Sequence, residues 1–166
     1  PKNIIVVLAV LLGLSGLMWW GKPTATSTAP LSGSNTGIGG VLFAEEKFYD
    51  IGTISMADGK VNKIFRVTNS GTSEINLKSI TTSCMCTVAY LIGATGEKGP
   101  FGMPGHGGPV RPANELIGAG ESRDLKVIYD PAAHGPAGVG PVDRFVYLVD
   151  DRGGTLELEI KALVTP

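Results

Sequence analysis

The sequence predicts an all-β domain, a sandwich of seven to eight short strands, which follows one N-terminal transmembrane helix. From Val41 onward, short runs of alternating apolar and polar residues recur, and a period of two is typical of strands with one buried face. The 24 glycines and 11 prolines, against 17% charged residues, indicate many turns rather than long helices. An uncharged apolar run before this region is the exception, and it predicts the membrane helix.

That run extends from Ile4 to Trp20, "IIVVLAVLLGLSGLMWW", and as a helix it would span about 26 Å. This length is near the lower limit for crossing a bilayer. Trp19 and Trp20 suit the membrane–water interface, because their rings are amphipathic. We therefore expect residues 1–21 to be a transmembrane anchor or an uncleaved signal. A cleaved signal peptide is the competing interpretation, since Ser27 and Ala29 are small enough for a signal peptidase.

Residues 22–40, "KPTATSTAPLSGSNTGIGG", have the composition of a flexible tether. Such a chain has a root-mean-square reach of about 25 Å, enough to hold a domain clear of the lipid headgroups. Lys2, before the apolar run, favours a cytoplasmic N-terminus. The domain at 41–166 is then expected to be membrane-anchored and extracytoplasmic, in the periplasm or on the outer face of the membrane.

Eight segments of this domain have the strand pattern. The last one, "TLELEIKALV", alternates Leu156, Leu158 and Ile160 with glutamates. A turn at 151–154, Asp-Arg-Gly-Gly, joins it to "RFVYLVD" and indicates a β-hairpin. The other segments are "VLFAE", "FYDIG", "KIFRVTN", "INLKSIT", "TVAYLI" and "DLKVIYD". Strands at this spacing favour a β-sandwich.

Three landmarks identify a family resemblance: "YDIG" at 49–52, "NSG" at 69–71 and "SCMCT" at 83–87. In this order they resemble a bacterial family of extracytoplasmic Ig-like domains of unknown function, related to the Hydin-type and major-sperm-protein-type sandwiches. The family's third landmark is Ser-Cys-Gly-Cys-Thr. The resemblance covers roughly Phe43 to Val164 and implies an immunoglobulin-like β-sandwich. Met85 stands in place of the glycine, and a shared sandwich does not fix function.

A long insertion at 93–120 also departs from the family pattern. Its sequence, "GATGEKGPFGMPGHGGPVRPANELIGAG", is longer than ordinary connections and has no evident secondary structure. Phe101, Met103 and His106 lie among glycines and prolines, which allow tight turns around a small site. The simpler interpretation is a Gly/Pro-rich surface loop with incidental side chains.

Cys84 and Cys86 are the 2 cysteines of the chain. On an extended strand, residues two apart point to the same side, with Cα atoms about 6 to 7 Å apart. This separation is at the upper edge of disulfide geometry, and the side chains would be nearly parallel. Two thiolates on one face can, by contrast, both reach one soft metal ion.

Met103 and His106 would complete a site for such an ion with Cys84 and Cys86. This set of soft and borderline ligands fits copper best. Zinc gains nothing from a thioether, and calcium and magnesium prefer carboxylates. His134 is a possible substitute for His106, because its loop is expected at the same end of the sandwich as the cysteines.

Two functions follow. The first is a membrane-tethered extracytoplasmic domain that binds a soft metal ion, with a copper ion as cofactor. The alternative is a non-metal interaction module of the cell envelope, with an envelope protein as partner and the cysteines in a structural disulfide. A third possibility is that the two cysteines are free thiols that only pack in the core. A thiol oxidoreductase is disfavoured, because no Cys-x-x-Cys begins a helix.

Other classes are disfavoured by composition and motifs. The net charge of −1 does not suit a nucleic-acid-binding protein, which needs a concentrated excess of Lys and Arg. The sequence has no serine elbow and no paired-carboxylate pattern, so we expect neither an enzyme nor a small-molecule substrate.

Overall fold

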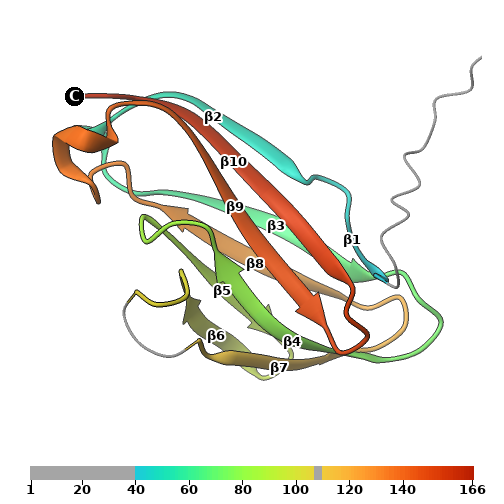
Figure 1. The fold of residues 1–166 in the computed structure, drawn as a ribbon. Coiled ribbons are helices and arrows are strands. Elements are labelled where there is room, and N and C mark those ends of the chain that lie inside the picture. The colour runs from blue at the N-terminus through green and yellow to red at the C-terminus, as the bar shows by residue number, and fades with distance from the viewer. Residues whose placement is uncertain (1–39, 107–109) are drawn as a thin grey trace, which may run out of the picture. The chain divides into compact units, whose positions relative to one another are not determined.

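Two five-stranded sheets form the two layers of a β-sandwich in the computed structural model (Figure 1). The structure describes residues 40–106 and 110–166. The predicted anchor at 1–21 and all but the last residue of the predicted tether at 22–40 lie outside this range. Among the described residues, no helix has the length and hydropathy that a membrane span requires.

The first sheet has the strand order β1-β3-β8-β5-β6, and the second has the order β2-β10-β9-β4-β7. The strands of the first sheet are β1 (Leu42–Ala44), β3 (Val61–Asn69), β8 (Ser122–Tyr129), β5 (Thr87–Gly93) and β6 (Gly96–Phe101). Those of the second are β2 (Phe48–Ser55), β10 (Thr155–Thr165), β9 (Gly140–Asp150), β4 (Ile75–Thr82) and β7 (Pro112–Ile117). Two short 3-10 helices, η1 (Met56–Asp58) and η2 (Gly135–Gly138), lie in connections. Neighbouring strands are antiparallel, except that β2 pairs with β10 in parallel.

All eight predicted strands are present, and the predicted hairpin joins β9 to β10. The expected number of seven to eight strands is too low, however, because β6 and β7 lie inside the segment at 93–120 that was expected to be a loop. Their sequences, "GEKGPF" and "PANELI", hide the strand pattern, since glycines and prolines interrupt one and the other buries Glu115 in place of an apolar residue. β6 runs back along β5, with Phe101 opposite Ala89.

One hydrophobic core fills the space between the sheets. β10 contributes buried residues at every second position, as its sequence predicts. Both sheets supply fully buried members of the same cluster, among them Phe65, Val67, Leu91, Leu125, Val127, Ile75, Leu77, Ile80, Leu148 and Leu158. A fold of this kind positions its loops rigidly at the two ends of the sandwich.

A smaller buried cluster closes one end of this core and contains Ile54, Cys86, Tyr129, Ala162 and Val164. We call this the cysteine end. Here β4 ends and β5 begins, and η2 lies in the connection between β8 and β9 (Figure 1).

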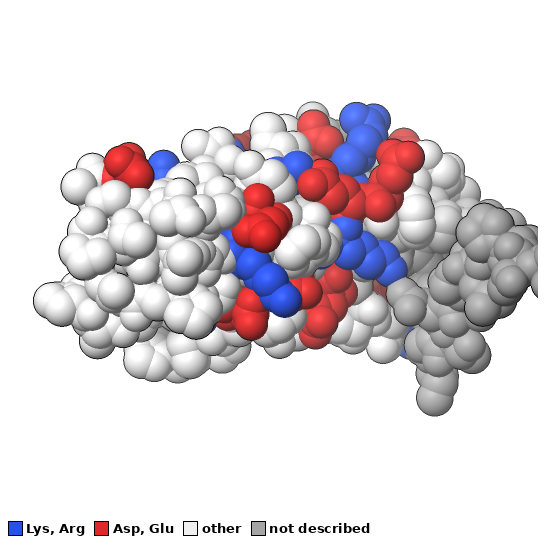
Figure 2. All heavy atoms as spheres, turned by 90° about the horizontal axis from the view of Figure 1, so that it is seen from above, with Lys and Arg blue, Asp and Glu red and all other residues white. Residues whose placement is uncertain are grey.

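Figure 2 shows acidic and basic side chains interleaved over one side of the sandwich, with few charges toward the left of the view. The ion pairs of Lys161 with Glu159 (3.2 Å) and with Asp143 (3.7 Å) are examples of this mixed surface. Neither sign of charge dominates the side in view.

Candidate metal centre

A tight turn between β4 and β5 carries both cysteines. The hydroxyl of Thr82, at the end of β4, lies within hydrogen-bond distance of the carbonyl oxygens of Cys84 (3.0 Å) and Thr87 (2.9 Å). The N–H of Thr87 also donates to the carbonyl of Cys84, at 3.1 Å. From the sequence we had expected Cys84 and Cys86 on an extended strand. They lie in a turn instead. The turn, rather than strand alternation, brings their sulfurs together.

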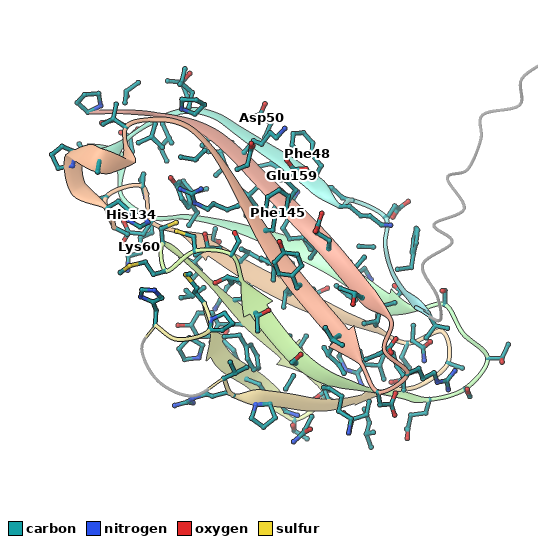
Figure 3. All side chains as sticks on the ribbon, in the orientation of Figure 1. Phe48, Asp50, Lys60, His134, Phe145 and Glu159 are labelled. Carbon is teal, nitrogen blue, oxygen red and sulfur yellow. The ribbon has the colours of Figure 1, made fainter. Side chains whose placement is uncertain are left out.

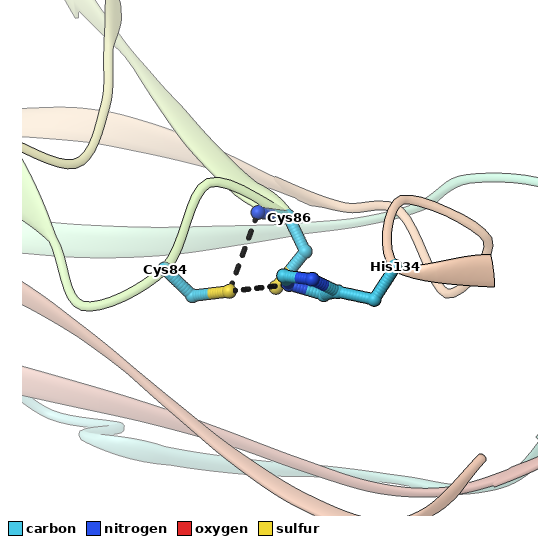
Figure 4. Close-up of side chains that lie close together, drawn as sticks. All are labelled: Cys84, Cys86 and His134. Atoms are coloured by element: carbon cyan, nitrogen blue, oxygen red, sulfur yellow. Dashed lines mark hydrogen bonds between the residues drawn. The ribbon is translucent and has the colours of Figure 1, made fainter. Parts of the chain in front are cut away.

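His134 reaches the cysteines from the connection between β8 and β9. The N–H of Asp130 donates to the carbonyl of Cys86 at 2.8 Å, which ties the start of this connection to the cysteine turn. η2 begins immediately after His134. The imidazole Nε2 lies 3.0 Å from the Sγ of Cys84 (Figure 4). Figure 3 shows His134 and Lys60 at this same end of the sandwich, with sulfur atoms beside them.

The two sulfurs and one imidazole nitrogen of Cys84, Cys86 and His134 all lie within 4.8 Å of one another. An ion bonded to two sulfurs at about 2.3 Å and one nitrogen at about 2.0 Å, in a trigonal plane, would separate these atoms by about 3.7 to 4.0 Å. To admit the ion, the 3.0 Å distance between His134 Nε2 and Cys84 Sγ would have to increase by about 0.7 Å. A small side-chain movement is therefore enough.

Arg144 on β9 completes the surroundings of the buried thiol. Cys86 is only 3% exposed, and the Nε–H of Arg144 donates to its Sγ at 3.0 Å. The hydroxyl of Thr87 lies 3.7 Å from the same sulfur. A guanidinium is always charged, so Arg144 holds a fixed positive charge against Cys86.

The two thiols titrate differently. Partial burial by itself would raise the pKa of Cys84, but hydrogen bonds with Cys86 and His134 and the charge of Arg144 outweigh it and lower the pKa to about 7. Burial and the neighbouring Cys84 raise the pKa of Cys86, which the hydrogen bond from Arg144 only partly offsets. Cys84 is therefore the thiol of the pair that ionises near neutral pH.

Met103 and His106 lie in a segment beside the cysteine turn. His106 is not among the three residues whose ligand atoms converge. Both residues line a neighbouring hollow that also includes Met85. The sequence had placed these two residues in one site with the cysteines, and the structure instead brings His134 to the sulfurs, the substitute that the strand directions had suggested.

No pattern in the sequence marks Arg144 as a member of the site. Arg144 lies in a strand segment, "VDRFVYLV", where an arginine beside Phe145 gives no sign of which side chain it contacts. Its position opposite Ile160 on β10 is known only from the strand register.

The profile of a family described as "Protein of unknown function (DUF1573)" matches residues 42–101, which include the cysteine turn. This match supports the resemblance to a domain family of unknown function. That family's Ser-Cys-Gly-Cys-Thr motif, against which Met85 was compared, stays a prediction. No curated protein matches the sequence.

Solved structures similar to this chain share its fold. A protein of unknown function from Porphyromonas gingivalis W83 has a TM-score of 0.52 and 18% identity, over 75% of this chain and 46% of that one. This chain thus spans less than half of that protein. The ASH/PapD-like domain 7 of human CEP192 has a TM-score of 0.47 and 11% identity, over 86% of this chain and 98% of that domain. At such identities the likeness is one of fold alone, and it does not bear on metal binding.

Proposed function

We propose that this chain is a membrane-tethered, extracytoplasmic Ig-like domain that binds one Cu(I) ion through Cys84, Cys86 and His134. The observation that carries the proposal is the convergence of their three ligand atoms within 4.8 Å of one another. Two thiolates and an imidazole form a soft ligand set of the kind that copper prefers.

The fixed charge of Arg144 favours a monovalent ion. Two thiolates carry two negative charges, and Arg144, which donates to Cys86 at 3.0 Å, carries one positive charge. Cu(I) would bring the site to neutrality, whereas Zn²⁺ would leave a net positive charge at a half-buried position. Uncompensated charge in such a setting is unfavourable. Arg144 therefore supports Cu(I) over Zn²⁺.

The state of the cysteines also supports a metal site over a structural disulfide. Both are free thiols, and each sulfur already contacts a polar group from another strand or loop, His134 for Cys84 and Arg144 for Cys86. A structural disulfide would need neither contact. In a metal site the imidazole is a ligand, and the guanidinium stabilises the thiolate form of the buried sulfur.

The placement of the domain outside the membrane is part of this proposal and depends on the sequence at 1–40. The uncharged run from Ile4 to Trp20 and the polar tether that follows support it. A domain of this kind would hold Cu(I) at the cell envelope for storage or for delivery to an envelope protein.

Anaerobic titration of the full chain with Cu(I), against a chromophoric Cu(I) chelator, tests the metal site. We expect one tightly bound equivalent in the unaltered chain. Cys84→Ser and Cys86→Ser should each abolish it, and His134→Asn should weaken it. His106→Asn is the matched control, because His106 is the other of the 2 histidines and should leave the tight equivalent unchanged.

A tight equivalent that survives Cys84→Ser would contradict the proposal. Equal effects of His134→Asn and His106→Asn would contradict the assignment of His134. If the chain binds no Cu(I) tightly at any pH between 6 and 8, about one unit on either side of the Cys84 pKa of about 7, the interaction module becomes the better account.

A further inference from the structure

A hollow of about 300 Å³ adjoins the cysteine turn, and neither His134 nor Arg144 lines it. Its lining consists of Met85, Thr87, Val88, Gly102, Met103 and His106. Three of these residues carry donor atoms that soft metals accept, the thioethers of two methionines and the imidazole of His106. The lining includes no carboxylate.

The inserted segment brings Met103 and His106 to this place. β6 runs back along β5, so the chain returns to the cysteine end after Phe101. The N–H of Thr82 then donates to the carbonyl of Gly102 at 3.2 Å, which fastens the segment beside the cysteine turn. The N–H of His106 donates to the carbonyl of Met103 at 3.3 Å and closes a turn. The thioether and the imidazole therefore come from one turn that lies beside the cysteine turn.

Two residues that line the hollow are also close to the thiols. Met85 lies between the cysteines in the sequence, and its side chain is 52% exposed although large and apolar. Thr87 lines the hollow, and its hydroxyl lies 3.7 Å from the Sγ of Cys86. An ion in the hollow would therefore be separated from the thiols by little more than the cysteine turn itself.

The ligands of the two places differ in charge. Thioethers and a neutral imidazole hold Cu(I) without releasing charge, whereas the thiolates of Cys84 and Cys86 add a direct electrostatic attraction. The hollow should therefore bind the ion more weakly than the thiol group. Zn²⁺, Ca²⁺ and Mg²⁺ gain little from thioethers, so the hollow also selects for a soft monovalent ion.

From these observations we infer that Met85, Met103 and His106 form a second, weaker site for a soft monovalent ion, through which Cu(I) passes to and from the thiol site. The transfer role depends on the proposed copper-binding function. The second site itself does not, because its ligands are separate from Cys84, Cys86 and His134. In the transfer, the ion exchanges thioether and imidazole ligands for thiolates, keeps its oxidation state, and displaces the thiol proton of Cys86 to solvent.

The test follows the ε-methyl resonances of methionine in the full chain, labelled with [methyl-¹³C]methionine, during titration with Ag(I), a redox-inert substitute for Cu(I). The chain has 4 methionines. With the first equivalent bound at the thiol group, a second equivalent should shift the resonances of Met85 and Met103. Met56 is the control, because it packs at the same end against the buried cluster around Cys86 but does not line the hollow.

Two variants separate this site from the thiol site. Met103→Leu keeps the side-chain volume and removes the sulfur, so it should abolish binding of the second equivalent and leave the first unchanged. Cys84→Ser should do the reverse, and Met85 and Met103 should then respond to the first Ag(I) added.

The inference is overturned if Met85 and Met103 do not respond at any Ag(I) ratio, or if Met103→Leu leaves the second equivalent in place. It is also overturned if Met103→Leu abolishes the first equivalent, since Met103 would then belong to the thiol site. If instead the unaltered chain binds no tight equivalent while Met85 and Met103 still respond to Ag(I), the proposed function is wrong and the second site stands.

Discussion

The two ends of the sandwich both bury charged or ionisable side chains, and they do so in opposite ways. At the end away from the cysteines, Glu115 is 5% exposed and its two carboxylate oxygens meet Lys98 at 2.7 Å and Arg123 at 2.8 Å. Arg123 in turn pairs with Glu121 at 3.1 Å. Two acidic and two basic side chains therefore neutralise one another, and each Glu115 oxygen has a cation.

The cysteine end has the same kind of fixed cation but an incomplete set of partners. Arg144 donates to Cys86 and Cys84 contacts His134, while the two sulfurs and the imidazole nitrogen lie within 4.8 Å of one another. With both cysteines ionised, the group has one net negative charge. Burial and charge alone therefore do not mark a functional site. What distinguishes the cysteine end is that one more cation would complete it.

The ionisation at the two ends differs accordingly. Burial by itself would raise the pKa of Glu115, but hydrogen bonds from Lys98 and Arg123 outweigh it, and its pKa lies below the ordinary value. Glu115 is therefore charged at all physiological pH values. The thiols, in contrast, change their protonation in the range where proteins work, since the pKa of Cys84 is about 7.

The largest expected effect is at the end of the sandwich that contains Glu115. Arg123→Met leaves the buried Glu115 with one cation, and we expect the free energy of unfolding to fall by about 3 kcal/mol. The same change at the cysteine end, Arg144→Met, should cost about 1 kcal/mol or less, because Cys86 can keep its proton and become neutral. Urea unfolding of the two variants at pH 7 measures the difference. Equal losses would mean that the two ends do not differ as described.

Copper should stabilise the folded chain only by binding at the cysteine end. At a free Cu(I) concentration of about 100 times the dissociation constant, the folded chain gains about 2.7 kcal/mol. This gain, seen as a rise in the midpoint of thermal unfolding, should vanish in Cys84→Ser. It should persist in Arg123→Met, which lowers the starting stability without touching the site. A gain that survives Cys84→Ser would place the ion elsewhere.

Cys84 should be the reactive thiol of the pair. Its alkylation by iodoacetamide should reach half of the maximal rate at pH about 7, while the buried Cys86 reacts more slowly. His134→Asn removes a hydrogen bond that lowers the pKa of Cys84, so the midpoint should move to higher pH. His106→Asn is the control and should leave the midpoint in place. A midpoint unchanged in His134→Asn would contradict the contact between the two side chains.

The affinity for Cu(I) should follow the same titration. A lowered pKa means that Cys84 is already ionised above pH 7 and must lose its proton to the ion below that pH. Binding should thus release about two protons per Cu(I) below pH 7 and about one above it, from Cys86, whose pKa is raised. Affinity falls as pH falls, and more steeply below pH 7. Measured affinities across this range, in low salt, give the slopes directly.

The smallest expected effect concerns the choice of ion. Arg144→Gln removes the fixed positive charge beside Cys86, so affinity for Zn²⁺ should rise relative to affinity for Cu(I) by about fivefold. Arg66→Gln is the matched control, since Arg66 is an exposed arginine on β3 whose pairing with Asp124 is long, at 3.8 Å. A ratio that is the same in both variants would remove Arg144 from the account of selectivity.

The sequence predicted the fold better than the site. Strands such as β10 are recognisable from the sequence, because their side chains alternate between core and solvent and the core positions are apolar. β7 does not, since Glu115 occupies an inward position and depends on Lys98 and Arg123 from other strands for its charge balance. Such compensation is a property of the folded chain.

Within the site, the chain's 2 cysteines were evident from the sequence, and strand direction placed the loop of His134 at their end. The choice between His106 and His134 could not be made in this way, because both loops come to the cysteine end and a distance of a few ångströms separates a ligand from a neighbour. The role of Arg144 could not be predicted for a similar reason, because its contact with Cys86 depends on the register of β9.

X-ray absorption at the copper K edge, on the full chain with one equivalent of Cu(I), tests the central claim most directly. If Cys84, Cys86 and His134 hold the ion, copper should have two sulfur neighbours at about 2.3 Å and one nitrogen at about 2.0 Å. The nitrogen should disappear in His134→Asn and remain in His106→Asn. A spectrum in which His134→Asn changes nothing, or in which sulfur is absent from the copper shell, would contradict the assignment of Cys84, Cys86 and His134 as the site.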